Sequence, residues 1–151
     1  MKYFAFLSMA LGMLFSCKSD KIEQDPSVKV IKYQESISLR NGTLKFTEVN
    51  DSRCPSDPGI FCITGGAAIV DLELRSAQDI SLRKQVRMCL GECGYLINGE
   101  RFSIEDTIII SLANINYSLI LFEVNPYPKF SPPQSEKDKK DYTIKLKLEQ
   151  K

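Results

Sequence analysis

The sequence predicts a single all-β domain, an antiparallel β-sandwich or β-barrel of about eight strands, behind an N-terminal lipoprotein signal. Three observations support this fold class. Apolar and polar residues alternate with a period of two in several stretches, two Asn-Gly pairs separate strand-like flanks, and no amphipathic helical pattern follows the signal region. With 151 residues, the chain is long enough for one hydrophobic core and too short for two domains of ordinary size.

Residues 1–16 are expected to be a lipoprotein signal peptide. Lys2 precedes an apolar run from Tyr3 to Phe15, which is shorter than the ~20 residues that a membrane-spanning helix needs. The run ends in "LFSC", which resembles a bacterial lipobox, although Phe15 is bulkier than the usual occupant of its position. The resemblance implies cleavage before Cys17 and lipidation of its sulfur, with several acyl chains as a firm membrane anchor. The alternative is an ordinary secreted protein in which Cys17 is incidental.

A polar segment separates this cysteine from the folded part. We expect residues 17–27 to include the lipidated cysteine and a flexible tether with a reach on the order of 15–20 Å, because "KSDKIEQDPS" carries no apolar pattern. Lys18 stands in place of the aspartate that resembles an inner-membrane retention signal in many Gram-negative bacteria. The expected location is therefore the cell envelope, at the outer membrane, on either its periplasmic or its surface side.

Residues 28–151 are predicted to form the β-domain. Alternating stretches place apolar side chains on one face and polar side chains on the other, as a half-buried strand requires. The runs "TIIISL" and "NYSLILFEV" add two strands, and the second is apolar on both faces, which predicts a central position. The residues expected to face inward in three alternating stretches are Ala68, Val70, Leu72 and Leu74; Ile80, Leu82, Val86 and Met88; and Tyr142, Ile144, Leu146 and Leu148.

Two hairpins are predicted where Asn-Gly lies between strand-like flanks. The stretches are "ISLRNGTLKF", with Asn41 and Gly42, and "YLINGERF", with Asn98 and Gly99. Asn-Gly suits a two-residue type I′ turn, in which both central residues have a positive φ angle. The long proline-rich segment after Asn125 is expected to cross one end of the fold.

Four cysteines remain beyond the anchor: Cys54, Cys62, Cys89 and Cys93. An even number of cysteines in an exported chain indicates disulfide bonds. We expect the local pairing, Cys54–Cys62 with Cys89–Cys93, because each pair falls within one loop whose prolines or glycines allow the chain to return. A crossed pairing, which would link the two loops, is the alternative.

Metal binding is the other possible use of these residues. The C-x7-C and C-x3-C spacings fit a zinc site poorly. Met88, Cys89 and Cys93 group soft sulfur ligands that suit Cu(I), although Met88 is also explained as the last inward residue of its strand. Asp51 and Asp57 could supply hard oxygen ligands for Ca²⁺, but the D-x-D-x-D spacing of a dedicated calcium loop is missing.

The residues around the first cysteine pair have a structural interpretation. We expect Asp51 to accept hydrogen bonds from backbone amides in its turn and Arg53 to pair with a carboxylate. The glycine pair Gly65 and Gly66 has no following helix or lysine, which argues against phosphate binding. It is expected instead to let the chain turn tightly into the strand that starts at Ala67.

The composition excludes several classes of function. The chain contains neither histidine nor tryptophan, which excludes histidine-dependent triads and metal sites built on imidazole. Lysine and arginine number 20 against 19 acidic residues, and Lys2 is the only charge in the signal region. A neutral mature chain without a basic stripe argues against nucleic acid as a partner.

One sequence element resembles a known family. "DSRCP", a second cysteine, and a glycine that leads into an apolar strand are similar to a set of small uncharacterised Bacteroidetes-type lipoproteins. The likeness continues through "CLGEC" and "NYSLILFEVNPYP" to the strand that opens at Tyr142. This chain departs from the family's C-[VI]-W-A-G pattern, since it reads "CITGG" and has a longer spacer. The resemblance implies export, lipid anchoring and a β fold, and it implies no activity.

We therefore expect a lipid-anchored, non-catalytic binding or structural domain that presents the loop closed by Cys54 and Cys62 to an envelope protein or glycan. A loop that is ordered beforehand loses less entropy on binding. The alternative is an envelope protein that handles copper or calcium. An enzyme with carboxylate or tyrosine catalysts is a third hypothesis, for which no recognisable constellation is present. No catalytic residue, cofactor or resident metal is assigned.

Overall fold

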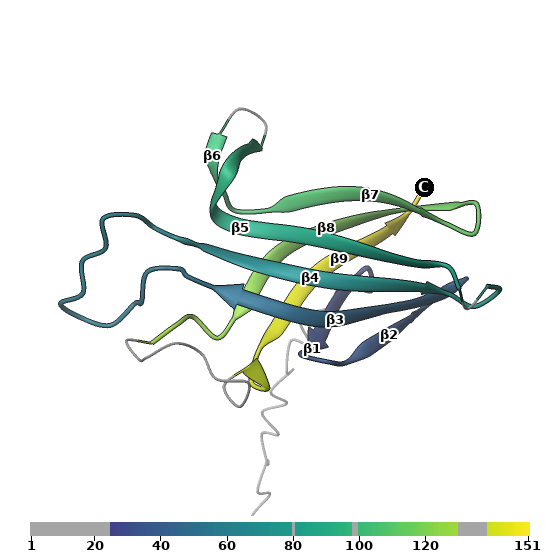
Figure 1. Ribbon diagram of the computed structural model, residues 1–151, viewed down its shortest axis with the longest axis horizontal. Coiled ribbons are helices and arrows are strands. Elements are labelled where there is room, and N and C mark those ends of the chain that lie inside the picture. The colour runs from purple at the N-terminus through teal and green to yellow at the C-terminus, as the bar shows by residue number, and fades with distance from the viewer. Residues whose placement is uncertain (1–24, 80, 98–99, 130–138) are drawn as a thin grey trace, which may run out of the picture.

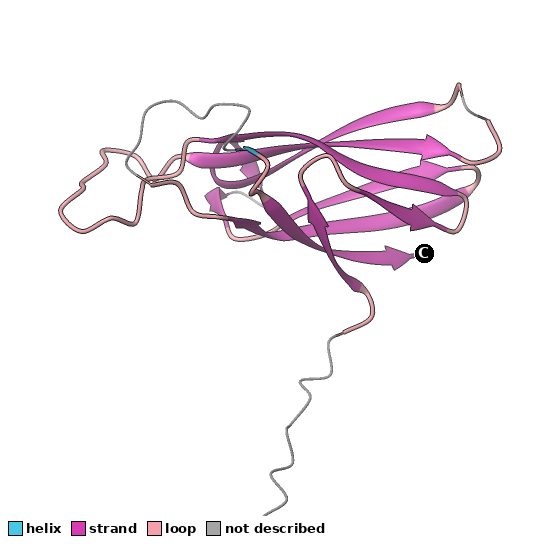
Figure 2. Cartoon of the chain, turned by 90° about the horizontal axis from the view of Figure 1, so that it is seen from below, coloured by secondary structure: helices cyan, strands magenta, loops and turns pink. Residues whose placement is uncertain are grey.

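The computed structural model describes residues 25–79, 81–97, 100–129 and 139–151, and the expected all-β fold is confirmed (Figures 1 and 2). The expected signal peptide, Cys17 and residues 18–24 of the expected tether lie outside the described residues. The strands are β1 (Val28–Lys32), β2 (Ser36–Leu39), β3 (Gly42–Asp51), β4 (Ala67–Ser76), β5 (Arg83–Ile97), β6 (Glu100–Ser103), β7 (Asp106–Leu112), β8 (Ile115–Asn125) and β9 (Thr143–Gln150).

The strands form two antiparallel sheets that pack as a sandwich. One has four strands in the order β1-β9-β8-β7, and the other has five in the order β2-β3-β4-β5-β6. β8 lies between β9 and β7, as its two apolar faces predict. The chain crosses from one sheet to the other between β1 and β2, where Tyr33 N donates to Tyr142 O and Gln34 N to Phe46 O, both at 2.9 Å.

The core lies between the two sheets and is filled from both of them. The inward alternation predicted for β4 and β9 is confirmed, because their apolar residues at every second position are buried or, for Leu148, partly buried. Phe46 meets Tyr33 edge to face, with 5.6 Å between the ring centroids. The largest fully buried side chains are Phe46, Ile31, Leu44, Leu72, Leu74, Met88, Leu112, Leu119, Leu121, Ile144, Leu146 and Val49.

The predicted start of β5 is wrong. Ile80 and Leu82 were expected on the inward face, but the strand begins at Arg83 and Leu82 is 38% exposed. Leu82 lies in the β4–β5 connection, where its carbonyl accepts a hydrogen bond from Ser76 N. Ile80 lies outside the described residues. Leu82 fits the alternation of β5 only in sequence, because it precedes the strand and lies in the connection.

The first hairpin is confirmed, but its turn is not formed by Asn-Gly. β2 pairs with β3 so that Leu39 faces Gly42, which leaves Arg40 and Asn41 as the turn. Gly42 is a buried strand residue, and a Cβ atom there would lie 2.0 Å from the Arg75 carbonyl oxygen. This glycine therefore serves close approach of two backbones rather than a positive φ angle.

The two-residue turn with positive φ at both positions occurs elsewhere. Ala113 and Asn114 have φ angles of 49° and 63° and connect β7 to β8, with Leu112 paired to Ile115. These are the angles that a type I′ turn requires. The β5–β6 hairpin is also present, because Ile97 pairs with Glu100, while the predicted turn at Asn98 and Gly99 lies outside the described residues.

Candidate functional site

The connection between β3 and β4 extends beyond the end of the sandwich (Figure 1). We call this connection, residues 52–66, the clamped loop. The Cys54–Cys62 disulfide closes it, with 5.9 Å between the two Cα atoms. The second disulfide joins Cys89 to Cys93, so the expected local pairing of the four cysteines is confirmed.

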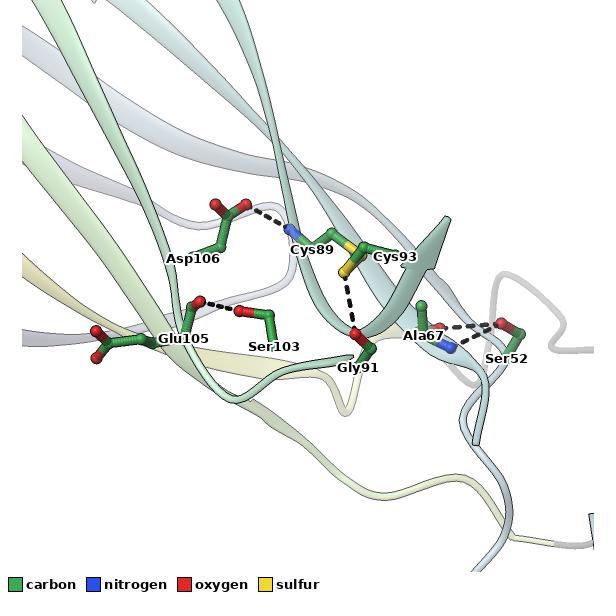
Figure 3. The surroundings of a disulfide bond; sticks show 8 residues. All are labelled: Ser52, Ala67, Cys89, Gly91, Cys93, Ser103, Glu105 and Asp106. Carbon is green, nitrogen blue, oxygen red and sulfur yellow. Dashed lines mark hydrogen bonds between the residues drawn. A yellow bond between two sulfur atoms is a disulfide. The ribbon is translucent and has the colours of Figure 1, made fainter. Parts of the chain in front are cut away.

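Hydrogen bonds hold the two ends of the clamped loop together. Ser52 N donates to Ala67 O and Cys54 N donates to Gly65 O, each at 2.8 Å. The Ser52 hydroxyl also bonds the backbone of Ala67 (Figure 3). Gly66 has a φ angle of +66°, and a Cβ atom there would lie 1.9 Å from Ser52 O. The predicted use of the glycine pair as a tight return into β4 is confirmed.

A buried ion pair forms the base of the loop. Arg53 Nε lies 2.8 Å from Asp51 Oδ1, and Arg53 Nη2 lies 2.6 Å from Asp51 Oδ2. The side chains of Arg53 and Asp51 are 7% and 0% exposed. Asp51 Oδ1 also accepts a hydrogen bond from the Arg53 amide at 3.1 Å. The structural interpretation of both residues is confirmed, and the carboxylate that pairs with Arg53 is Asp51 itself.

The same pair joins both sheets. Arg53 Nη2 donates to the Pro126 carbonyl at 3.2 Å, and the guanidinium carbon lies 4.0 Å from the Tyr127 ring centroid. The Tyr142 hydroxyl donates to Asp51 Oδ2 at 3.1 Å. Burial acts to lower the pKa of Arg53, but the hydrogen bond and the charge of Asp51 outweigh it and raise this pKa above its usual value. Arg53 is therefore a permanent cation, neutralised locally by Asp51.

The clamped loop exposes two large apolar side chains beside its disulfide. Phe61 and Ile63, which flank Cys62, are 97% and 105% exposed. Exposed apolar residues scattered singly are ordinary, but two fully exposed ones beside the same disulfide make this loop a candidate contact surface. The disulfide limits the positions that these side chains can take.

The Cys89–Cys93 disulfide braces a bend in β5. Gly91 and Gly94 within or next to the bridged segment have φ angles of +96° and +72°, and from this bend the end of β5 and β6 turn away from the sheet (Figure 1). The Cys89 amide donates to the buried carboxylate of Asp106, the first residue of β7, at 2.9 Å (Figure 3). The bend is thereby attached to the opposite sheet.

The two disulfide-braced segments meet at one cavity. Glu92 N donates to Gly66 O at 2.9 Å, so the β5 bend contacts the base of the clamped loop. Beside this contact lies an open cavity of about 280 Å³, to which both sheets contribute. It is lined by Arg53, Gly65, Gly66, Leu90, Gly91, Phe102, Ser103, Ile104, Phe122, Glu123, Val124, Asn125 and Tyr127.

The side chains considered for the alternative, a copper or calcium site, have other partners. The sulfurs of Cys89 and Cys93 are bonded to each other, and Met88 is fully buried in the core. The Asp51 carboxylate faces Arg53 rather than a loop cavity. Within the described ranges, no group of three or more cysteine, aspartate or glutamate residues is placed to hold a metal ion.

Comparison with protein-family models, curated proteins and solved structures finds no match to this chain. Across the part of the chain that the structure describes, no helix is long and apolar enough to cross a membrane.

Sequence reasoning missed most of the cavity. Phe102, Ile104, Phe122 and Tyr127 come from β6, β8 and the turns that follow them, and no spacing in the sequence relates them. The sequence did single out four stretches that contribute to the wall, namely "DSRCP", the glycine pair, "CLGEC" and "NYSLILFEVNPYP", but it did not relate them to one another. Sheet packing brings the remaining residues to Arg53.

Proposed function

We propose that this chain is a lipid-anchored, non-catalytic protein of the bacterial outer membrane that presents the clamped loop and the cavity at its base to a partner in the envelope. The carrying observation is the exposure of Phe61 and Ile63 on either side of Cys62, in a loop held by a disulfide. Burying two such side chains in a partner contributes binding energy, and the covalent clamp reduces the entropy lost on binding.

The expected export and anchoring are part of this proposal. Two disulfides suit an oxidising compartment outside the cytoplasm. The lipobox-like segment before Cys17 supports a lipid anchor at that residue. Intact mass of the purified chain reports the anchor directly: we expect loss of residues 1–16 and the added mass of acyl chains, and an unmodified Cys17 would contradict this part.

Binding is tested with the full lipidated chain, immobilised in detergent, and solubilised envelope material from the cells that make it. We compare the wild type with a loop variant, Phe61→Ser with Ile63→Ser. The matched control is Val30→Ser with Ile109→Ser, because these side chains are 44% and 61% exposed on strands outside the site. Biolayer interferometry measures each affinity.

We expect the loop variant to bind at least about tenfold more weakly and the control to stay within about twofold of the wild type. Loss of an apolar contact is the physical reason for the difference. Equal binding by the wild type and the loop variant, or no binding by either, would overturn the proposed function.

A further inference from the structure

We propose that the cavity beside the clamped loop binds a neutral glycan, with a sugar ring against its aromatic side chains. This inference rests on the proposed function and names the chemistry of the partner. It stands on the apolar surfaces in the cavity, on its balance of charge, and on an uncommitted hydrogen-bond donor in its wall.

The apolar surfaces of the cavity are aromatic and exposed. Phe102, Phe122 and Tyr127 are 54%, 37% and 49% exposed, and Ile104 is 79% exposed. Aromatic rings offer flat faces for the C–H groups of a ligand. A volume of about 280 Å³ lies near the lower end of the range for small-ligand sites and suits one or two sugar units.

The charges in the cavity wall are balanced. Arg53 and Glu123 are the charged lining residues. Arg53 is neutralised by its bidentate pair with Asp51, and Glu123 pairs with Lys145 at 2.7 Å. A charged ligand would lose its hydration here without meeting an opposite net charge. An uncharged ligand has a much smaller hydration free energy to lose on entering. The charge balance therefore favours an uncharged ligand.

Polar groups in the wall can still recognise hydroxyls. Arg53 is nine-tenths buried, and its Nε and Nη2 atoms bond Asp51 and Pro126. Among the described residues no hydrogen bond uses Nη1, which leaves a donor for a ligand oxygen. Asn125 Nδ2 donates to Glu123 Oε1, and this amide–carboxylate pair offers further acceptors. Few polar groups among apolar walls are typical of a small-ligand site.

The decisive experiment uses the immobilised full chain and divides the solubilised envelope material into two arms. Periodate, removed before the assay, cleaves vicinal diols in one arm, and a protease digests proteins in the other. We expect periodate to abolish binding and protease to leave it unchanged. Loss of binding after protease alone would overturn the glycan and leave the proposed function standing, with a protein as the partner.

A matched pair of variants locates the site. Ile104→Ser changes a cavity residue, while Ile109→Ser changes an exposed residue of β7 outside the cavity. We expect the first to weaken binding at least about fivefold and the second by less than about twofold. Equal effects would overturn the assignment to this cavity. If the loop variant, Phe61→Ser with Ile63→Ser, also binds like the wild type, the proposed function is overturned together with the assignment to this cavity.

An engineered fluorophore tests neutrality. The chain has no tryptophan, so Phe102→Trp introduces a single reporter into the cavity. The probe is the envelope polysaccharide that passes unretained through an anion exchanger. We expect a blue shift of the emission and an affinity that changes less than about twofold between 0.05 and 0.5 M NaCl. A response only to the retained, charged fraction would overturn the proposal.

Discussion

Two glycines of the clamped loop have the same left-handed backbone and very different surroundings. Gly59 has a φ angle of +85°, and nothing lies within 4 Å of a Cβ atom built on it. Gly66 has a φ angle of +66°, and its Cβ atom would overlap Ser52 O. An alanine at Gly59 meets only the conformational cost of left-handed backbone, whereas one at Gly66 also separates the two ends of the loop.

We expect Gly59→Ala to lower the free energy of unfolding by about 1 kcal/mol and Gly66→Ala to lower it by more than about 3 kcal/mol. Urea unfolding of the full chain without reductant measures both values. Because the substitution is the same, the difference between the two losses in free energy of unfolding measures the cost of the collision with Ser52 O. Similar losses for the two variants would show that the loop base is less tightly closed than described.

At the scale of elements, each disulfide braces one segment that lines the cavity. Cys54 and Cys62 are separated by 8 positions and hold the clamped loop, while Cys89 and Cys93 are separated by 4 and hold the bend of β5. Neither bridge links two strands of the sandwich. The sheets are therefore held by their hydrogen-bond ladders and by the core, and the bridges order the end that carries the site.

We expect Cys54→Ala with Cys62→Ala to lower the free energy of unfolding by roughly 2.5 kcal/mol. Cys89→Ala with Cys93→Ala is expected to lower it by roughly 2 kcal/mol, because the shorter ring restricts the unfolded chain less. Hydrogen exchange should rise in residues 55–64 of the first variant and stay low in β4 and β8 of both. Increased exchange throughout β4 would contradict this division between loop and sheets.

At the scale of the whole molecule, the Asp51–Arg53 pair connects the two sheets at one end. Asp51 ends β3 in the five-stranded sheet, and Pro126 and Tyr142 adjoin β8 and β9 in the four-stranded one. A buried cation that loses its counter-charge is costly, whereas replacement of the whole pair by apolar residues can be nearly neutral. The way the two sheets are joined at this end therefore depends on the presence of both Asp51 and Arg53.

We expect Asp51→Asn to lower the free energy of unfolding by about 3 kcal/mol, because it leaves the Arg53 charge buried and unpaired. The double variant Asp51→Asn with Arg53→Met should recover part of this loss. Chemical denaturation of the single and double variants measures the coupling. A double variant at least as unstable as the sum of the two single variants would contradict it.

Local patterns predicted most of the fold. Alternation identified β4 and β9 because one face of each strand packs against the core and the other faces water. Successive residues therefore alternate between apolar and polar. The cysteine spacing favoured local disulfides for a similar reason, since each pair is near in the chain. Gly42 shows where such reasoning stops: the glycine suggested a turn, but the approach of Arg75 from the neighbouring strand explains it. The turn at Ala113 and Asn114 contains no glycine and carried no signal.

Residue patterns alone predicted a β-domain and favoured two short disulfide-closed segments, because period-two burial and short covalent rings depend on neighbours along the chain. The packing of the two sheets was needed to show that the domain is a sandwich, that Arg53 pairs with Asp51, and that both braced segments border one cavity. The physical reason is that Phe102, Phe122 and Arg53 come from different strands and loops. Their proximity follows from how two sheets pack, which no local pattern records.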